Sequence, residues 1–297
     1  MSLPLAVITG ARGQLGQALV ATAPEDWRAA GFGRRELDLT RPDQLRAVLG
    51  RERPALVINA AAYTRVDDAE REPEAARAVN ARGAGDLAAA AHAVGARVIH
   101  VSTDFVFDGA AARPWRVEDE PRTRGAYAAS KLEGERAVAA ATRGEALVVR
   151  TAWLHSAVGH NFPHLMLRLM RERDTVAVVS DRVGSPTWAS SMARALWAAA
   201  ARPALRGVLH WVDAGVASRY DFAVAVQEEA LALGLLARPV RLVPVGAEEF
   251  PEAAPRPAYA VLDTRSSARA LGLEPEHWRV NLRRMLAELR TRSGIAG

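Results

Sequence analysis

Four short apolar runs, separated by longer alanine-rich segments, constrain this chain more than any other feature of its sequence. The runs are rich in β-branched residues and carry continuous rather than alternating apolar positions, as strands buried on both faces do. They read LAVITG (5–10), LVINAAA (56–62), RVIHVST (97–103) and ALVVRT (146–151). Because the segments between them have helical periodicity, the pattern predicts repeated β-α-β units. We therefore expect an α/β fold with a parallel sheet covered by helices.

Local signals agree with this alternation in the first half of the chain and weaken in the second. In LDLTRPDQLRAVLG, Thr40 is a candidate N-cap and Pro42 suits the first helical turn. After residue 150 the alternation gives way to loops such as SDRVGSPTW and FPEAAPRPAYAVLD. We expect a second, smaller lobe in that half, interleaved with late strands of the sheet.

Composition excludes several classes of function. The chain has no cysteine, which removes thiolate metal sites and a cysteine nucleophile, and its seven histidines show no ligand-like spacing, so we expect no metal site. Its formal net charge is +5, but arginines alternate with acids throughout, which favours a mixed solvated surface over a nucleic-acid partner. Apolar runs of about eighteen residues and secretory-signal features are both missing, so we expect a cytoplasmic protein without a membrane partner.

The first apolar run ends in a glycine-rich loop, VITGARGQLG, in which Gly10, Gly13 and Gly16 lead into a predicted helix. Glycine at such positions permits a tight turn and lets the backbone approach a pyrophosphate closely. The N–H groups and the dipole of the following helix then face the negative charge. The spacing is G-x-x-G-x-x-G, and its place between strand and helix indicates a dinucleotide-binding loop.

The chain contains a single lysine, Lys131, beside 38 arginines among its 39 basic residues, and it follows Tyr127 by four positions. Residues i and i+4 share one face of a helix, so the phenol and the ammonium address one bound substrate together. A tyrosine phenol in water has a pKa of about 10, and a nearby cation favours its ionised form. We expect Tyr127 to be an acid–base group whose pKa Lys131 lowers, and Lys131 to reach ribose hydroxyls as well.

Polar residues directly follow the run at 97–103, where VIHVSTDFVFDG places Ser102, Thr103 and Asp104. The carboxyl ends of parallel strands line the ligand crevice of an open α/β sheet. A hydroxyl at this point is expected to hydrogen-bond a substrate oxygen beside Tyr127. The alternative is a turn-forming cluster, which this residue combination also favours.

The chain resembles the extended short-chain dehydrogenase/reductases, and within them the dTDP-4-dehydrorhamnose reductase family, nearly end to end. The blocks that carry the resemblance are GARGQLG, VINAAAYTRVDDAE, VSTDFVFDG, YAASKLEGE, RTAWLHSAVGHNF, DRVGSPTW and RPAYAVLDT. It implies NAD(P)H-dependent reduction of the 4-keto group of dTDP-4-dehydro-L-rhamnose to dTDP-L-rhamnose, for cell-surface polysaccharide. It also implies a Rossmann-type doubly wound parallel sheet over residues 1–150, joined by late strands, and a substrate-binding lobe mainly over 151–297.

The same resemblance implies roles for individual residues. The catalytic residues would be Thr103, Tyr127 and Lys131. The cofactor would be lined by Tyr127, Lys131, Gly10, Gly13, Gln14, Leu15, Asp38, Leu39, Ala61, Ala62 and Tyr63. The sugar nucleotide would contact Thr103, Asp104, Trp153, Asn161 and Arg256. Three of these have structural alternatives: Trp153 as a core side chain, Asn161 as a helix cap and Arg256 as a solvated loop charge.

The choice of cofactor depends on GFGRREL at the end of the second strand, where NADH-preferring enzymes tend to carry an acid. An arginine suits a 2′-phosphate, so we expect NADPH to be preferred or at least well used, with Arg34 or Arg35 at the phosphate. NADH use stays open, since both arginines have an alternative position in solvent beside Glu36. Some relatives bind magnesium at a dimer contact through a glutamate just after the glycine loop. Here Gln17 and Ala18 occupy that stretch, which leaves magnesium and a homodimer open.

Two other classes of protein compete with the reductase. A nucleotide-sugar epimerase or dehydratase would use the same scaffold, but such dehydratases place Asp-Glu after the threonine, and here Phe105 follows Asp104. A non-catalytic NADP-binding module, similar to the regulatory subunit of methionine adenosyltransferase, would not need an intact Thr103, Tyr127 and Lys131. The intact set favours an enzyme.

Overall fold

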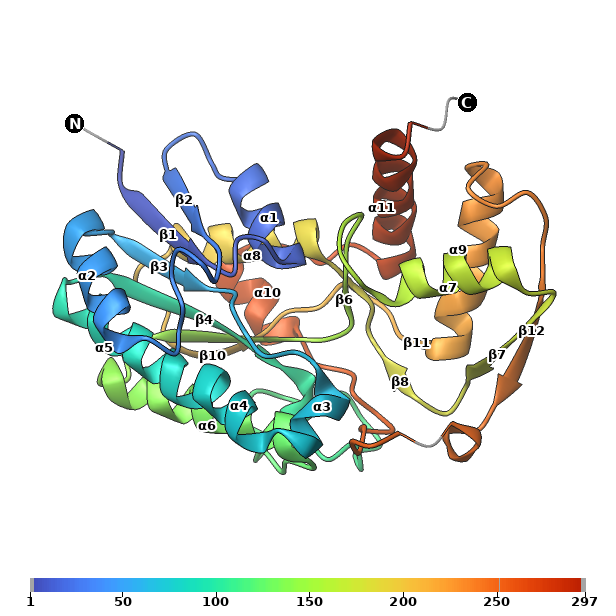
Figure 1. The fold of residues 1–297 in the computed structure, drawn as a ribbon, viewed down its shortest axis with the longest axis horizontal. Coiled ribbons are helices and arrows are strands. Elements are labelled where there is room, and N and C mark those ends of the chain that lie inside the picture. Colours follow the sequence, from blue (N-terminus) through green and yellow to red (C-terminus); the bar gives the residue numbers. More distant parts are fainter. Residues whose placement is uncertain (1–2, 251, 295–297) are drawn as a thin grey trace.

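The computed structural model describes residues 3–250 and 252–294, and its centre is a six-stranded parallel sheet in the order β10-β5-β4-β3-β1-β2 (Figure 1). All four predicted runs are strands of this sheet. The strands are β1 (Leu5–Thr9), β2 (Arg28–Phe32), β3 (Leu56–Asn59), β4 (Arg97–Thr103), β5 (Leu147–Thr151) and β10 (Gly207–His210).

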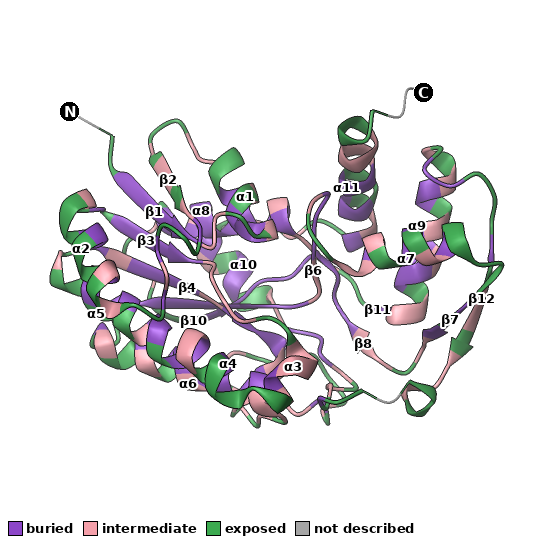
Figure 2. Ribbon diagram, viewed as in Figure 1, coloured by how far each residue is buried: buried purple, intermediate pink, exposed green. Residues whose placement is uncertain are grey.

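Helices cover both faces of the sheet, which explains why β1 and β3 are buried along their whole length (Figure 2). One face packs against α1 (Gln14–Ala21), α8 (Ala189–Ala200) and α10 (Arg265–Leu271). The other packs against α2 (Pro42–Glu52), α5 (Ala84–Ala93) and α6 (Ala126–Ala141). The expected fold class, a doubly wound α/β sheet, is confirmed.

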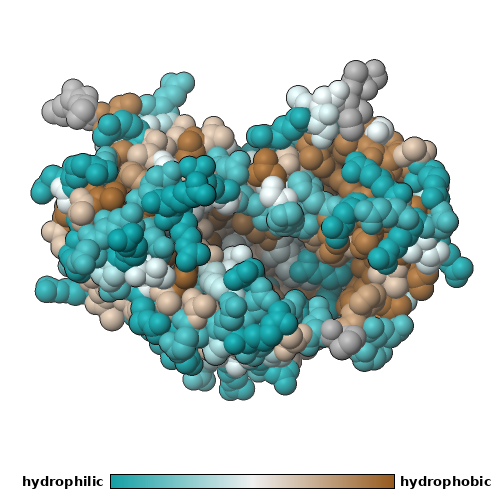
Figure 3. Space-filling model, in the orientation of Figure 1, coloured by the Kyte–Doolittle hydropathy of each residue, from teal (hydrophilic) through white to brown (hydrophobic). Residues whose placement is uncertain are grey.

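A smaller lobe stands beside the sheet, with the fully buried Phe222 in its core. It contains the parallel pair β7 (Thr175–Val179) and β12 (Arg241–Val245), with α7 (Phe162–Glu172), α9 (Arg219–Ala232) and α11 (Trp278–Arg292). Short two-residue strands connect the lobes: β6 (Leu154–His155) pairs with β9 (Thr187–Trp188), and β8 (Val183–Gly184) with β11 (Ala217–Ser218). The surface is hollowed between the two lobes (Figure 3).

The second half of the chain contributes to both lobes, because α8, β10 and α10 pack on the large sheet. The boundary expected at residue 150 stays a prediction. Two short helices, α3 (Val66–Arg71) and α4 (Pro73–Arg77), and a π-helical segment over Ala78–Gly83 lead into α5. In the part of the chain that the structure describes, no helix has the length and apolar character that crossing a bilayer requires.

The start of α2 corrects one expectation. The helix begins at Pro42, and the residue before it is Arg41, so Thr40 is not its cap. The backbone N–H and the hydroxyl of Thr40 instead donate to Asp38 Oδ1, at 2.9 and 2.8 Å. Asp38 therefore closes a local turn ahead of the helix, as aspartate side chains often do.

Candidate active site

The order of the strands reverses between β1 and β3, and the glycine loop lies at this switch point. Gly10 follows β1 with φ +68°, and a Cβ on it would lie 2.8 Å from the carbonyl oxygen of Ala60, after β3. A Cβ on Gly16 would lie 2.2 Å from the carbonyl oxygen of Gly10. The loop and the exit of β3 therefore approach each other at a distance that only glycine allows.

The N-terminus of α1 has the features that a pyrophosphate needs. Gly13 precedes the helix and has no side chain to cap it. The first backbone N–H groups of α1 therefore donate to no capping side chain. Leu15 in the first turn buries its side chain in the core beneath the sheet, with 5% exposed. The residues present thus fit a dinucleotide, with the helix N–H groups facing its phosphates.

Gln14, the first residue of α1, contacts the loop after β6. Its Oε1 accepts hydrogen bonds from Ser156 Oγ at 3.0 Å and from Asn161 Nδ2 at 2.9 Å. The Oδ1 of Asn161 accepts from the backbone N–H of His164 at 3.2 Å and caps α7. The helix-cap alternative therefore describes the Asn161 side chain, and its contact with a sugar nucleotide stays a prediction.

The backbone of the loop after β3 is held by two buried asparagines that sequence analysis did not single out. Asn59 Oδ1 accepts from the N–H of Ala61 at 3.2 Å, and Asn80 Oδ1 accepts from the N–H of Tyr63 at 2.8 Å. Ala62 lies half-buried between them. The predicted cofactor-lining stretch 61–63 is thus fixed beside the glycine loop, and the asparagines are its supports.

A basic pocket of about 670 Å³ opens at the carboxyl end of β2. Its lining residues are Arg12, Arg34, Arg35, Asp38, Arg41 and Gln44. Arg12 forms an ion pair with Glu36 at 2.7 Å, and Arg34 lies 3.4 Å from Asp38. Leu39, in contrast, is buried in the core at 4% exposure. The structure brings Arg34 and Arg35 to one pocket with a third arginine, Arg12, that sequence analysis did not assign.

Thr103 and Tyr127 meet where β4 ends and α6 begins. Thr103 Oγ1 donates to Asp104 Oδ1 at 2.9 Å, and Phe105 packs edge-on against the Tyr127 ring with centroids 5.5 Å apart. Tyr127 is nearly buried, and burial raises its pKa to about 12, although its contact with the Thr103 hydroxyl acts in the opposite direction. The expectation that Lys131 lowers the Tyr127 pKa is therefore wrong here, because desolvation outweighs any stabilisation of the phenolate.

Lys131 lies four residues further along α6 and is 2% exposed. Its Nζ donates to the carbonyl oxygen of Val101 on β4 at 2.8 Å. Burial lowers the Lys131 pKa to about 8, while the negative charge of Glu135 acts in the opposite direction. The ammonium is thus fixed between helix and sheet, directly beneath the strand end that carries Thr103.

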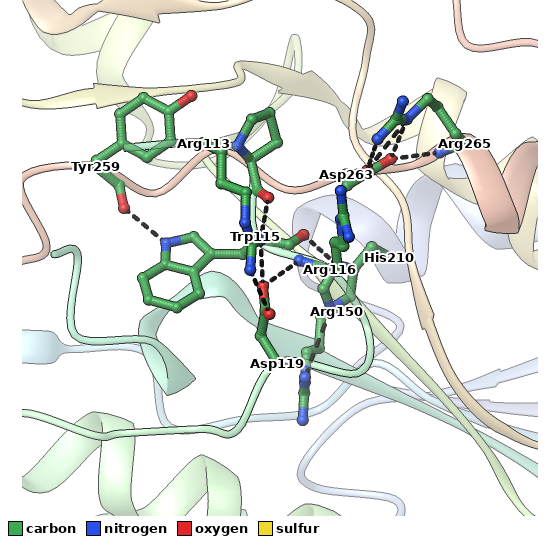
Figure 4. A network of polar contacts seen from close by, with 10 residues as sticks. Arg113, Trp115, Arg116, Asp119, Arg150, His210, Tyr259, Asp263 and Arg265 are labelled. Atoms are coloured by element: carbon green, nitrogen blue, oxygen red, sulfur yellow. Dashed lines mark hydrogen bonds and ion pairs between the residues drawn. The ribbon is translucent and has the colours of Figure 1, made fainter. Parts of the chain in front are cut away.

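Glu135 belongs to a buried network beneath the site. It accepts two hydrogen bonds from Arg150 on β5, at 2.9 and 2.7 Å, and one from Ser102 Oγ at 2.5 Å. Arg150 also lies 3.5 Å from His210 on β10, whose Nδ1 is 3.1 Å from the carbonyl oxygen of Trp115 (Figure 4). The network joins α6, three strands and the loop at 113–119. An arginine within the apolar run ALVVRT was the sequence signal for it.

Asp104 is a buried carboxyl without a full set of partners. Burial raises its pKa to about 7, against the opposing effects of Thr103 and the charge of Arg219. Its Oδ2 has no hydrogen-bond partner among the residues described. A buried polar atom of this kind is unfavourable until something satisfies it, so Asp104 suits a hydroxyl of a bound sugar.

Trp153 is a strained residue, with φ +45°, and its ring lies so close to Gly184 that a Cβ there would be 2.6 Å from it. The guanidinium of Arg219, at the start of α9, stacks over this ring at 3.6 Å. Arg256 lies in a different environment, because its guanidinium forms a two-pronged ion pair with Asp67 at 3.0 and 2.7 Å. Arg256 is therefore occupied by a carboxylate, and its contact with a substrate phosphate stays a prediction.

A dinucleotide loop at the switch point, with a threonine, a tyrosine and a lysine at the end of β4 and on α6, defines an extended short-chain dehydrogenase/reductase. The chain matches the family described as RmlD substrate binding domain over residues 5–291. It is 45% identical over 288 residues to the dTDP-4-dehydrorhamnose reductase of Mycobacterium tuberculosis, covering 95% of this chain and 92% of that one. The chain belongs to the dTDP-4-dehydrorhamnose reductase family.

Solved structures agree with this assignment. The dTDP-4-dehydrorhamnose reductase from Bacillus anthracis, crystallised with NADP, has a TM-score of 0.91 and 34% identity, covering 97% of this chain and 100% of that one. The UDP-glucose 4-epimerase of Thermus thermophilus, with NAD, has a TM-score of 0.80 at 18% identity, covering 96% and 99%. The second likeness shows the shared fold alone.

Proposed function

We propose that this protein reduces the 4-keto group of dTDP-4-dehydro-L-rhamnose to give dTDP-L-rhamnose, with NADPH as the electron donor. The observation that carries the proposal is the position of Thr103 and Tyr127 beside each other at the carboxyl end of β4, with Lys131 fixed beneath them. Its membership of the reductase family supports the substrate.

The residues have distinct tasks in this reaction. A bound reduced nicotinamide supplies a hydride for C4 of the sugar. Tyr127, held protonated by the burial that raises its pKa to about 12, donates its proton to the alkoxide that forms at the C4 oxygen. The Thr103 hydroxyl, which donates to Asp104 Oδ1 in this structure, would turn to donate to that oxygen. The Lys131 ammonium stabilises negative charge as the phenol loses its proton, and it binds the ribose. Burial of all three side chains excludes water from the proton transfer.

The basic pocket at the end of β2 supports a preference for NADPH. Arg35 has no carboxylate partner within 4 Å among the described residues, and Arg34 is only loosely paired with Asp38 at 3.4 Å. The pocket is lined by four arginines and one carboxylate, so a 2′-phosphate would complement its excess positive charge, and arginine forms strong bonds with phosphate. A role for magnesium and a homodimer both stay open. Across residues 3–250 and 252–294 the structure contains no cluster of three metal-ligating side chains.

The test is direct. The protein is mixed with dTDP-4-dehydrorhamnose and either NADPH or NADH, nicotinamide oxidation is followed by absorbance, and the sugar product is identified by NMR. We expect oxidation that depends on the sugar nucleotide and is faster with NADPH. Absence of oxidation with both cofactors would contradict the proposal, and would favour a non-catalytic NADP-binding module.

A further inference from the structure

Arg219 is an arginine at the start of α9 whose charge is influenced by the carboxylates of Asp104 and Glu252 without a direct ion pair to either. Among the described residues it forms no ion pair within 4 Å, although Asp221 follows two positions later. The Asp221 carboxylate is committed to the capping box of α9, where it accepts from the backbone N–H and hydroxyl of Ser218 at 2.9 and 2.7 Å. The guanidinium of Arg219 is therefore without a direct carboxylate partner among the described residues.

The surroundings of Arg219 hold it in one orientation. Its guanidinium lies 3.6 Å from the centroid of the Trp153 ring and 5.1 Å from that of Phe162. Stacking of this kind uses the face of the guanidinium and leaves its N–H donors, which lie in the plane, available to another partner. Burial lowers the Arg219 pKa to about 10, a value at which the group still carries its charge at neutral pH.

Other arginines that border the same region are already occupied. Arg256 pairs with Asp67 and, at 3.1 Å, with Glu252, and Arg182 donates to the carbonyl oxygen of Arg256. Asp104 and Arg219 influence each other's pKa from opposite lobes, yet they form no ion pair. The buried Asp104 and the half-buried Arg219 are thus incompletely satisfied groups of opposite charge that act on each other, and Asp104 also acts on Tyr127.

We propose that Arg219 binds the diphosphate of the nucleotide-sugar substrate and so selects sugars that are carried on a diphosphate. The inference rests on the function proposed above, and it names a residue that sequence analysis did not assign. With the diphosphate on Arg219, the sugar can lie toward Asp104, whose free oxygen accepts a hydrogen bond from a sugar hydroxyl. The stacked geometry suits the two-pronged hydrogen bonds that guanidinium forms with phosphate oxygens.

The experiment measures binding of dTDP, without a sugar, to the full chain in saturating NADP⁺ by calorimetry. Arg219→Met should weaken dTDP binding by roughly 10- to 100-fold, the range that the loss of a hydrogen bond between charged groups produces. Arg219→Gln should lose as much, and decides the question if the methionine variant does not fold. Arg238→Met is the matched control, since this exposed arginine pairs with Asp174 in the same lobe and should keep parental affinity.

Two results would overturn the inference. One is parental dTDP affinity in a folded Arg219→Met or Arg219→Gln variant. The other is an Arg219→Lys variant as weak as Arg219→Met, together with a dependence of dTDP affinity on salt that is the same in parent and variants. That pattern would show that Arg219 stacks on the nucleobase and does not bind the diphosphate by its charge.

Failure of the proposed function is separable from failure of this inference. Turnover of dTDP-4-dehydrorhamnose by the parent protein tests the function alone. A parent that binds dTDP through Arg219 but oxidises no NADPH would retain the diphosphate site and lose the reductase assignment. A parent that reduces dTDP-4-dehydrorhamnose, but whose dTDP affinity is unaffected by Arg219→Met, would retain the reductase assignment and lose the diphosphate site.

Discussion

The carbonyl oxygen of Asn80 lies against Gly134, and a Cβ on Gly134 would be only 2.0 Å from it. At this point helix α6 packs against the π-helical segment Ala78–Gly83. The Asn80 side chain also donates to Ser130 Oγ on α6 at 3.0 Å, while its Oδ1 accepts from the N–H of Tyr63. One asparagine thus joins helix α6 to the loop that is predicted to line the cofactor.

Gly134→Ala is expected to destabilise the protein by about 1–3 kcal/mol, because the added methyl group overpacks a contact with backbone that cannot move away. Gly50→Ala is the matched control. Gly50 lies in helix α2 with nothing within 4 Å of the added Cβ, so alanine should stabilise by about 0.5–1 kcal/mol. Urea unfolding of the three proteins measures both changes. Equal stabilities for the two variants would show that α6 has room at Gly134.

Asp104→Asn is expected to gain stability relative to the parent as the pH rises. Burial raises the Asp104 pKa to about 7, above the value of about 3.9 in an unfolded chain. The folded parent therefore binds the proton more tightly than the unfolded chain does. Its free energy of unfolding consequently falls as the pH rises from about 4 toward 7. Asparagine does not ionise, so the variant should gain at least about 1 kcal/mol over the parent between about pH 5 and pH 8.

Unfolding free energies of parent and variant at both pH values test this expectation, with Asp43→Asn on the exposed surface of α2 as the control. A difference between parent and Asp104→Asn that does not change with pH would mean that Asp104 is ionised in the folded protein throughout this range.

The sheet could be predicted from the sequence because each central strand is a continuous apolar run, and the glycine loop because it joins a strand to a helix. The edge strand β10 could not be found in this way. Strand β10, GVLH, is four residues long and follows a loop, and nothing local distinguishes it from other apolar tetrapeptides. Its place beside β5 results from packing with α8 and α10, which only the folded chain brings together.

The site was predicted unevenly for a similar reason. Spacing predicted that Tyr127 and Lys131 share one face of a helix, and both lie on α6. The Tyr127 pKa was predicted in the wrong direction, because the cation was counted and the cost of desolvation was not. Arg219, proposed here to bind the diphosphate, was not singled out because its distinguishing feature, the absence of an ion pair within 4 Å among the described residues, depends on where residues distant in sequence lie. The sequence does not distinguish Arg256 from Arg219. In the described structure only Arg256 of these two forms an ion pair with a carboxylate.

Tyr127→Phe is expected to lower kcat by roughly 10²–10⁴-fold, because the phenol is the proposed proton donor for the new alkoxide. The Tyr127 ring packs against Phe105, and phenylalanine keeps that contact, so the fold and the dTDP affinity should stay near those of the parent. Steady-state NADPH oxidation and calorimetry measure the two effects. Tyr220→Phe, which removes a hydroxyl from a side chain packed on the core of the smaller lobe, is the control. A Tyr127→Phe enzyme with parental kcat would assign the proton to another group.

The double variant Arg34→Ala/Arg35→Ala is expected to weaken NADPH binding by at least about tenfold and to leave NADH binding nearly unchanged, because only NADPH carries the 2′-phosphate. Arg46→Ala/Arg51→Ala removes two exposed arginines from α2, outside the lining of the basic pocket, and is the control for net charge. Fluorescence titration with each cofactor measures the affinities. An equal loss for NADPH and NADH, or no loss for either, would remove the two arginines from the 2′-phosphate site.

Lys131→Arg tests whether the single lysine of the chain is needed as a lysine. The Nζ of Lys131 donates to the carbonyl oxygen of Val101 at 2.8 Å, and the lysine is 2% exposed. The planar fork of arginine cannot place one compact charge at that position. We expect kcat/KM to fall by at least about 10²-fold, because positioned acid–base catalysis is lost. Arg136→Lys, the reverse exchange at an exposed position of the same helix, should be silent. A kcat/KM of Lys131→Arg within about threefold of the parent value would show that charge alone suffices. Such a change corresponds to less than about 1 kcal/mol, which is below the contribution of one hydrogen bond to a charged group.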